Sequence, residues 1–198
     1  MTFISALDQA LLQVTRQLGR PNVPRAPVAA YVELFEAWNQ KINLSAARTR
    51  EAIELQVSDA VHAVVPLRQC RRILDVGAGG GLPGVLVATF LPDAVVVSLE
   101  PVHKKHAFLR TVARTLGLKN YQVHARRLVQ TDVGFDGAVS RATFALGEWL
   151  ELGQAAVVAG GVVVGMEGLE QVKLTDRDVR RPYVVDGKTR ALIVRSVG

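Results

Sequence analysis

A glycine-rich segment is the part of the sequence best suited to bind a ligand through its backbone. It reads Asp75-Val-Gly-Ala-Gly-Gly-Gly81 and lies between two apolar runs. Glycine adopts positive φ without strain, so such a segment can turn tightly and approach a ligand closely. Glu100 ends the next apolar run along the chain, where a carboxylate can accept two hydrogen bonds from a ribose diol. The pattern predicts a site for a ligand that contains a nucleoside.

Two ligands fit this arrangement, a dinucleotide and S-adenosylmethionine. Leu82 stands where the dinucleotide pattern G-x-G-x-x-G needs a third glycine. S-adenosylmethionine carries a cationic sulfonium and an ammonium group but no phosphate, which suits an acidic pocket. We therefore expect S-adenosylmethionine as the cofactor, held by Asp75, Gly77, Gly79 and Glu100. The simpler alternative for Asp75 is a helix cap or a turn residue, and the alternative enzyme class is a nucleotide-dependent oxidoreductase.

S-adenosylmethionine serves in the methylation of nucleic-acid bases, and different target atoms need different protein side chains. Two of these sets of side chains are missing from the expected positions. Attack through a pyrimidine carbon needs a cysteine nucleophile, but Cys70 precedes the first expected strand, away from the carboxyl ends where ligands bind. Methylation of an exocyclic amine often uses an Asn/Asp-Pro-Pro-aromatic turn, and Ser140-Arg-Ala142 stands in its place. Guanine N7 needs neither device, because its lone pair is nucleophilic at neutral pH and positioning can supply most of the rate. The histidines, His62, His103, His106 and His124, lack metal-ligand spacing, so we expect no metal.

The elements that must position these residues alternate in type along most of the chain. Helical periodicity over 4–18, 28–41 and from 49 onward predicts a helical extension over 1–65. The remainder, 66–198, alternates strands with helices, which predicts an α/β, Rossmann-like sheet, mostly parallel, with helices on both faces. We expect strands at 72–77, 94–100, 121–125, 136–140 and 162–166, and helices at 82–90, 102–116 and 146–158, the last stopped by Gly160-Gly161. A closing hairpin of 183–185 and 191–194 across Asp186-Gly187 would add one antiparallel strand.

Charge is distributed unevenly over the 198 residues, whose formal net charge is +6. The segment 102–127 holds no acidic residue and these basic ones: Lys104, Lys105, Arg110, Arg114, Lys119, Arg126 and Arg127. Such a block favours a nucleic acid, although a solvated helix face is the simpler alternative. A single cysteine excludes a disulfide framework. The longest apolar run, 155–166, is shorter than a membrane-spanning helix needs, so we expect no membrane segment and a cytoplasmic protein.

Several segments together resemble the RsmG (GidB) family, which methylates guanine N7 in bacterial 16S ribosomal RNA. Trp38-Asn-Gln-Lys-Ile-Asn-Leu-Ser45 is similar to the family's W-N-K-x-x-N-L-T, and 73–84 to its L-D-V-G-x-G-x-G-[FL]-P-G loop. Further matches follow in the family's order over roughly 28–168: Leu99-Glu100, Lys104-Lys105, Phe108-Leu109, 116–120, Arg126 and Ser140-Arg-Ala142.

The resemblance implies a class I S-adenosylmethionine-dependent methyltransferase that acts on 16S rRNA or the small ribosomal subunit. We expect the protein to be a monomer. It implies further cofactor contacts from Leu82, Arg127, Leu128 and Arg141. Lys104 and Lys105 would face the RNA, and with them Arg110 and Arg126 of the basic block. Arg141 is the candidate catalytic residue, acting by positioning, and no general base is expected.

Three positions depart from the family's pattern. Its H-x-x-D-S reads Gln56-Val-Ser-Asp-Ala60, Leu128 replaces a carboxylate, and Glu167 replaces a lysine. These departures leave the glycine-rich loop intact. They keep open a second hypothesis, in which the chain is not an enzyme but a degenerate RNA-binding protein that no longer transfers methyl groups.

Overall fold

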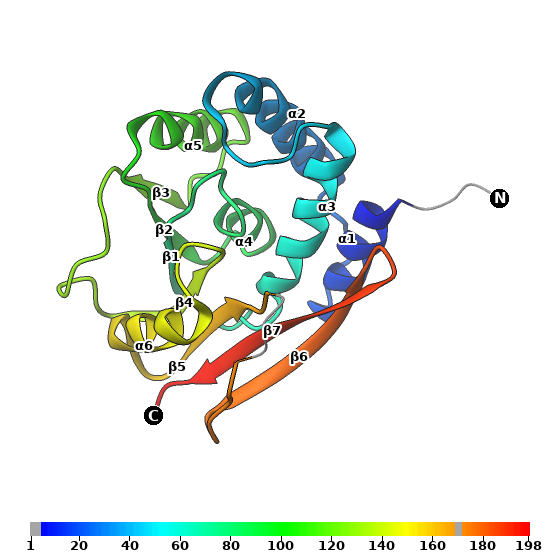
Figure 1. Ribbon diagram of the computed structural model, residues 1–198. Coiled ribbons are helices and arrows are strands. Elements are labelled where there is room, and N and C mark those ends of the chain that lie inside the picture. The colour runs from blue at the N-terminus through cyan, green and yellow to red at the C-terminus, as the bar shows by residue number, and fades with distance from the viewer. Residues whose placement is uncertain (1–4, 169–171) are drawn as a thin grey trace.

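The apolar runs of the chain form the strands of a seven-stranded sheet in the order β3-β2-β1-β4-β5-β7-β6 (Figure 1). The computed structural model describes residues 5–168 and 172–198. Strands β1 to β5 are parallel, and β7 pairs antiparallel with both β5 and β6. The prediction of a mostly parallel sheet with one antiparallel strand is confirmed. The strands are Arg72–Val76 (β1), Val95–Leu99 (β2), Tyr121–His124 (β3), Phe135–Ser140 (β4), Val157–Met166 (β5), Asp178–Val185 (β6) and Lys188–Ser196 (β7).

Both faces of the central strands are buried, which explains why those strands are almost continuously apolar. Successive side chains of a strand point to opposite faces. Ile73 therefore joins one hydrophobic cluster, and Leu74 joins the other. The first cluster contains helices α1 to α5, and the second contains α6, so helices cover both faces unequally (Figure 1). The helices are Ala6–Gln17 (α1), Arg25–Ile42 (α2), Arg50–Ala60 (α3), Gly84–Phe90 (α4), His103–Thr115 (α5) and Leu146–Ala156 (α6).

Polar caps fix where α1 and α3 begin. The side chains of Ser5 and Thr49 accept backbone N–H groups at the starts of α1 and α3, as N-cap residues do. Ile4, where the first helix was expected to begin, lies outside the described residues. Helices α1 to α3 bury their apolar stripes in the same core as α4 and α5. The division at residue 65 therefore stays a prediction.

Helix α6 ends earlier than expected, and the sequence-based boundary at residue 158 is wrong. Val157 already belongs to β5, and Gly160-Gly161 lies inside that strand. The register of β4 against β5 shifts between Phe135 and Gly137. A Cβ on Gly161 would lie 2.6 Å from the carbonyl oxygen of Asp136, so glycine permits the close approach of the two strands rather than ending the helix.

The C-terminal hairpin confirms the expected turn. Strands β6 and β7 are joined by Asp186 and Gly187, which adopt φ of 51° and 68°. Two consecutive positive φ values are typical of the tight turn that Asp-Gly favours. Among the described residues, no helix is long and apolar enough to cross a membrane.

Candidate active site

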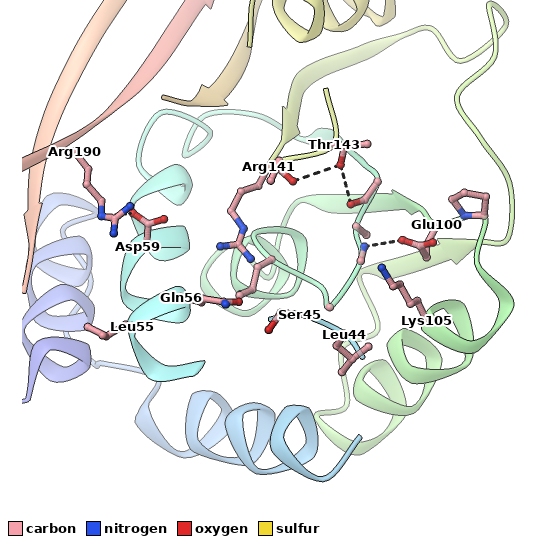
Figure 2. Close-up of a pocket in the computed structure, with 17 residues that line it drawn as sticks. Leu44, Ser45, Leu55, Gln56, Asp59, Glu100, Lys105, Arg141, Thr143 and Arg190 are labelled. Carbon is pink, nitrogen blue, oxygen red and sulfur yellow. Dashed lines mark hydrogen bonds and ion pairs between the residues drawn. The ribbon is translucent and has the colours of Figure 1, made fainter. Parts of the chain in front are cut away.

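A cavity of about 630 Å³ opens at the carboxyl edge of the sheet, a volume typical of small-ligand sites. The strand order changes direction between β1 and β4, and ligands bind at such switch points in open α/β sheets. The segments that follow β1, β2 and β4 all reach the cavity (Figure 2). Its lining comprises Leu44, Ser45, Leu55, Gln56, Asp59, Gly77, Ala78, Gly79, Gly80, Leu82, Glu100, Pro101, Lys105, Arg141, Ala142, Thr143 and Arg190.

The glycine-rich loop after β1 is packed against helix α2 and the turn after β4. Gly77 has a φ of +70°, and a Cβ there would come within 2.2 Å of the Thr143 hydroxyl. A Cβ on Gly80 would lie 2.4 Å from the Phe35 ring. The Tyr31 hydroxyl donates a hydrogen bond to the Gly80 carbonyl at 2.5 Å. Helix α2 therefore sets the path of the loop, and Gly77, Gly79 and Leu82 lie on the cavity wall. Their contact with the cofactor stays a prediction.

Glu100 is buried beside this loop and is held by two backbone groups. Its Oε2 accepts from the N–H of Gly79 and its Oε1 from the N–H of Val102, both at 2.8 Å. Each carboxylate oxygen has a second lone pair. Glu100 lines the cavity, so both oxygens can still accept hydrogen bonds from the hydroxyl groups of a ligand.

Asp75 lies beneath the glycine-rich loop and is not part of the cavity lining, so the expected direct contact with a ligand is not supported. Its side chain is buried and accepts from the Ser98 hydroxyl at 2.8 Å and from the N–H of Gly84, where α4 begins. A Cβ on Gly84 would lie 2.2 Å from Asp75 Oδ2. Burial raises the pKa of Asp75 to about 7, against the opposing effects of Ser98 and Arg141. The helix-start role, the simpler alternative, fits this geometry.

Arg141 follows β4, and its side chain extends into the cavity (Figure 2). Within the described part of the chain, its guanidinium has no hydrogen-bond or ion-pair partner. It lies close enough to lower the pKa of the buried Asp75 electrostatically. Its donors are therefore available to a ligand.

Arg127 and Leu128 line a second, more apolar hollow of about 410 Å³. It shares Gly77, Pro101 and Thr143 with the first cavity. The two hollows therefore adjoin across the loop that carries Glu100. An apolar slot next to a ribose-binding carboxylate suits a flat heteroaromatic ring, which is consistent with the expected places of Arg127 and Leu128.

Arg126 forms a paired interaction inside its own loop, which differs from the expectation that it binds RNA. Its Nη1 and Nη2 donate to the two carboxylate oxygens of Asp132 at 2.6 and 2.5 Å. This contact is the main cause of a lowered Asp132 pKa. Asp132 also accepts the N–H of Val129 at 2.9 Å. Arg126 thus fastens the loop between β3 and β4, where the chain carries Arg127 and Leu128.

Helix α5 presents the other candidate RNA contacts. Lys104 and Arg110 are exposed, whereas Lys105 is half-buried and lines the cavity. Arg110, Arg114 and Lys119 surround a separate shallow hollow of about 450 Å³. Lys105 therefore places positive charge at the cavity, and Arg110, Arg114 and Lys119 form a second basic area.

The wall of the cavity opposite the glycine-rich loop was missed by the sequence reasoning. It consists of Leu55, Gln56 and Asp59 on α3, with Arg190 of β7 beside them (Figure 2). The only signal in the sequence was the partial match of 56–60 to a family pattern. In the described ranges, no group of three or more His, Cys, Asp or Glu side chains could hold a metal ion.

Comparisons with known proteins agree with this geometry. Residues 25–190 match the family described as GidB, rRNA small subunit methyltransferase G. The ribosomal RNA small subunit methyltransferase G of Chromobacterium violaceum is 36% identical over 179 residues, which cover 87% of this chain and 85% of the relative. The protein of that name from Laribacter hongkongensis is 36% identical over 168 residues, 82% of this chain and 81% of the relative.

Solved structures share the fold at low sequence identity. Cofactor-bound Rv0187 from MTB superposes with a TM-score of 0.66 at 16% identity, covering 99% of both chains. The O-methyltransferase from Bacillus cereus in complex with SAH gives a TM-score of 0.62 at 17% identity, covering 98% of both. The fold and the family match together define a class I S-adenosylmethionine-dependent methyltransferase. More specifically, the chain belongs to the rRNA small subunit methyltransferase G (GidB) family.

Proposed function

We propose that this chain methylates N7 of a guanine in 16S ribosomal RNA, using S-adenosylmethionine. The observation that carries the proposal is a single cavity that combines the glycine-rich loop, Glu100 and Arg141, whose guanidinium is unpaired among the described residues, with the basic helix α5 at its mouth. The family and the relatives named above support a ribosomal RNA substrate. Such a substrate implies action in the cytoplasm, whereas a monomeric state stays a prediction.

The residues around the two adjoining hollows fit the cofactor. Glu100 would accept hydrogen bonds from the ribose hydroxyls. Gly77 and Gly79 would allow the backbone to approach the cofactor closely, and Leu128 and Arg127 would lie beside the adenine. S-adenosylmethionine, when bound, supplies a methyl group attached to a cationic sulfur. On transfer to N7, the sulfur keeps the electron pair of the carbon–sulfur bond and becomes neutral. Asp75 would act from beneath the loop without direct contact, by holding Ser98 and the start of α4 in place.

Guanine N7 requires no base from the protein, because its lone pair is free at neutral pH. Among the described residues, those that line the cavity include neither cysteine nor histidine. Cys70 packs against Gly137 instead, and burial raises the pKa of its thiol to about 12. The lining therefore suits a reaction that depends on positioning, and Arg141 is the residue best placed to orient guanine or the cofactor.

Transfer of labelled methyl groups tests the proposal directly. The protein is incubated with labelled S-adenosylmethionine and 16S rRNA or small subunits that lack the modification, and the nucleosides are separated by mass. We expect label in 7-methylguanosine. Binding of both cofactor and RNA without 7-methylguanosine would instead favour the degenerate RNA-binding protein.

One departure from the family pattern is accounted for by a local ion pair. Glu167, which replaces a lysine, accepts two hydrogen bonds from Arg180 at 2.8 and 2.9 Å. This contact is the main cause of the lowered pKa of Glu167. Glu167 does not line the cavity, so the charge reversal gives no support to a loss of methyl transfer.

Reversing Lys104 and Lys105 to glutamate should weaken RNA binding several-fold and flatten its salt dependence, because phosphate contacts release counterions. Binding is measured by titration of 16S rRNA over a range of salt concentrations. The matched control reverses Arg68 and Arg71, two exposed cations at the opposite edge of the sheet, and should leave the slope nearly unchanged. An equal slope in all three proteins would assign helix α5 to an ordinary solvated face.

A further inference from the structure

We infer that Asp59 recognises the target base, by accepting hydrogen bonds from N1–H and the N2 amino group of guanine. The inference rests on the proposed function and assigns the substrate half of the same cavity. Asp59 would determine the specificity for guanine, a role that neither the glycine-rich loop nor the basic helix α5 performs.

The cavity has two facing walls (Figure 2). The glycine-rich loop and Glu100 form the wall assigned to the cofactor. Gln56 and Asp59 project from α3 on the other side, and the Arg141 side chain extends between the walls toward Gln56. A substrate base must therefore lie against α3 if the cofactor lies against the loop.

Asp59 is held so that one of its oxygens stays available. Its Oδ1 accepts from the Tyr183 hydroxyl at 2.8 Å and lies 3.4 Å from Arg190 Nε. Its Oδ2 has no partner among the described residues, although the side chain is only 14% exposed. Contacts to one oxygen fix the carboxylate, and a fixed acceptor binds a ligand with less loss of freedom.

Gln56 provides a second acceptor on the same wall. Its Oε1 is buried and has no hydrogen-bond partner among the described residues. Positions three apart on a helix share a face, so Gln56 and Asp59 point to the same side of α3. Leaving a buried acceptor unpaired is unfavourable, so rotation of this amide toward N–H groups of a ligand in the cavity would relieve the cost.

Guanine has the donor pattern that this wall requires. Its Watson–Crick edge presents N1–H next to the N2 amino group, whereas adenine and cytosine present a ring nitrogen acceptor. Enzymes that act on bases read this edge of an extruded nucleotide. With that edge on α3, N7 lies on the opposite side of the purine and faces the loop and Glu100. The O6 atom lies between the two edges, where Arg141 can donate to it.

A combined change of protein and base tests the contact. Once the methylated nucleotide is mapped, RNA is prepared with guanine or inosine there, because inosine lacks only the N2 amino group. We expect wild-type kcat/KM for 7-methylation to be about ten-fold higher on guanine, the lower range for a hydrogen bond to a charged group. In Asp59→Asn, the preference should fall to about two-fold or less, because Tyr183 and Arg190 keep the amide oxygen and the amino group then replaces Oδ2, so the N2 amino group of guanine loses its acceptor.

Glu51→Gln is the matched control, because it makes the same carboxylate-to-amide change at an exposed position of α3 that does not line the cavity. It should retain the guanine preference, and Asp59→Asn should retain the wild-type affinity for S-adenosylmethionine in calorimetry. An Asp59→Asn protein with an unchanged preference, or a wild-type protein without one, overturns the inference while 7-methylguanosine still forms. Absence of 7-methylguanosine on guanine RNA would instead refute the proposed function.

Discussion

Replacing Glu100 with alanine should weaken S-adenosylmethionine binding about 10- to 150-fold, because hydrogen bonds to a charged group contribute about 1.5–3 kcal/mol. The carboxylate is buried and each oxygen already accepts one backbone N–H. Its loss would leave the ribose hydroxyls unpaired and release the N–H groups of Gly79 and Val102. Calorimetric titration of the purified protein with S-adenosylmethionine measures the change in affinity.

Two comparisons separate the ribose contact from general damage. Glu33→Ala removes an exposed carboxylate from the outer face of α2 and should leave the affinity unchanged. Glu100→Gln keeps one acceptor oxygen and should fall between wild type and Glu100→Ala. Unchanged affinity in Glu100→Ala would remove Glu100 from the cofactor site. Tighter binding of NAD than of S-adenosylmethionine by the wild type would favour the oxidoreductase alternative.

The positions of Gly77, Glu100 and Arg141 could be predicted from the sequence because each directly follows a strand. Parallel strands bring their carboxyl ends to the same edge of a sheet, so residues distant in sequence meet there without any long-range information. The apolar runs that form β1, β2 and β4 are short, almost uninterrupted and flanked by glycine or polar residues. Local pattern was therefore sufficient for this part of the site.

The wall formed by α3 could not be predicted in the same way. Its arrangement depends on Tyr183 bonding Asp59 across 124 residues of sequence. The Asp132 partner of Arg126 was missed for a different reason. A basic block suggests surface charge, but one acidic residue just beyond the block at 102–127 is enough to pair with Arg126 near its end. Composition reports the charges that are present and not which of them are neutralised.

Asp75 shows how one sequence feature can support two roles. Its place two residues before Gly77 suggested a contact with a cationic ligand. Side chains of a strand alternate between the two faces of the sheet, however, and Asp75 points to the face where it meets Ser98 of β2. Gly84 then has to lack a side chain, because Asp75 occupies that space. The match of this segment to the family loop therefore reflects packing at the start of α4 as well as ligand binding.

Replacing Arg141 with lysine should lower methyl transfer at least ~10-fold, which corresponds to about 1.4 kcal/mol of lost positioning. Lysine keeps the positive charge but loses the planar pair of donors that guanidinium presents to a carboxylate or a carbonyl oxygen. N7 methylation makes guanine cationic, so Arg141 does not act by stabilising the charge of the product. Its useful contacts are guanine O6, an RNA phosphate or the carboxylate of the cofactor, and each depends on geometry more than on charge.

The Arg141→Lys protein should fold normally, because its guanidinium has no partner among the described residues and lies at the rim of the sheet. Thermal unfolding checks this, and Arg68→Lys, at the opposite edge, is the matched arginine-to-lysine control. The rate is measured as labelled methyl transferred to small-subunit RNA, with 7-methylguanosine identified as the product. A fully active Arg141→Lys protein would remove Arg141 from the site. A loss of rate at saturating cofactor and RNA, with both affinities retained, would place its contribution in the positioning of N7 against the methyl group, because such a loss reports an interaction made only in the transition state.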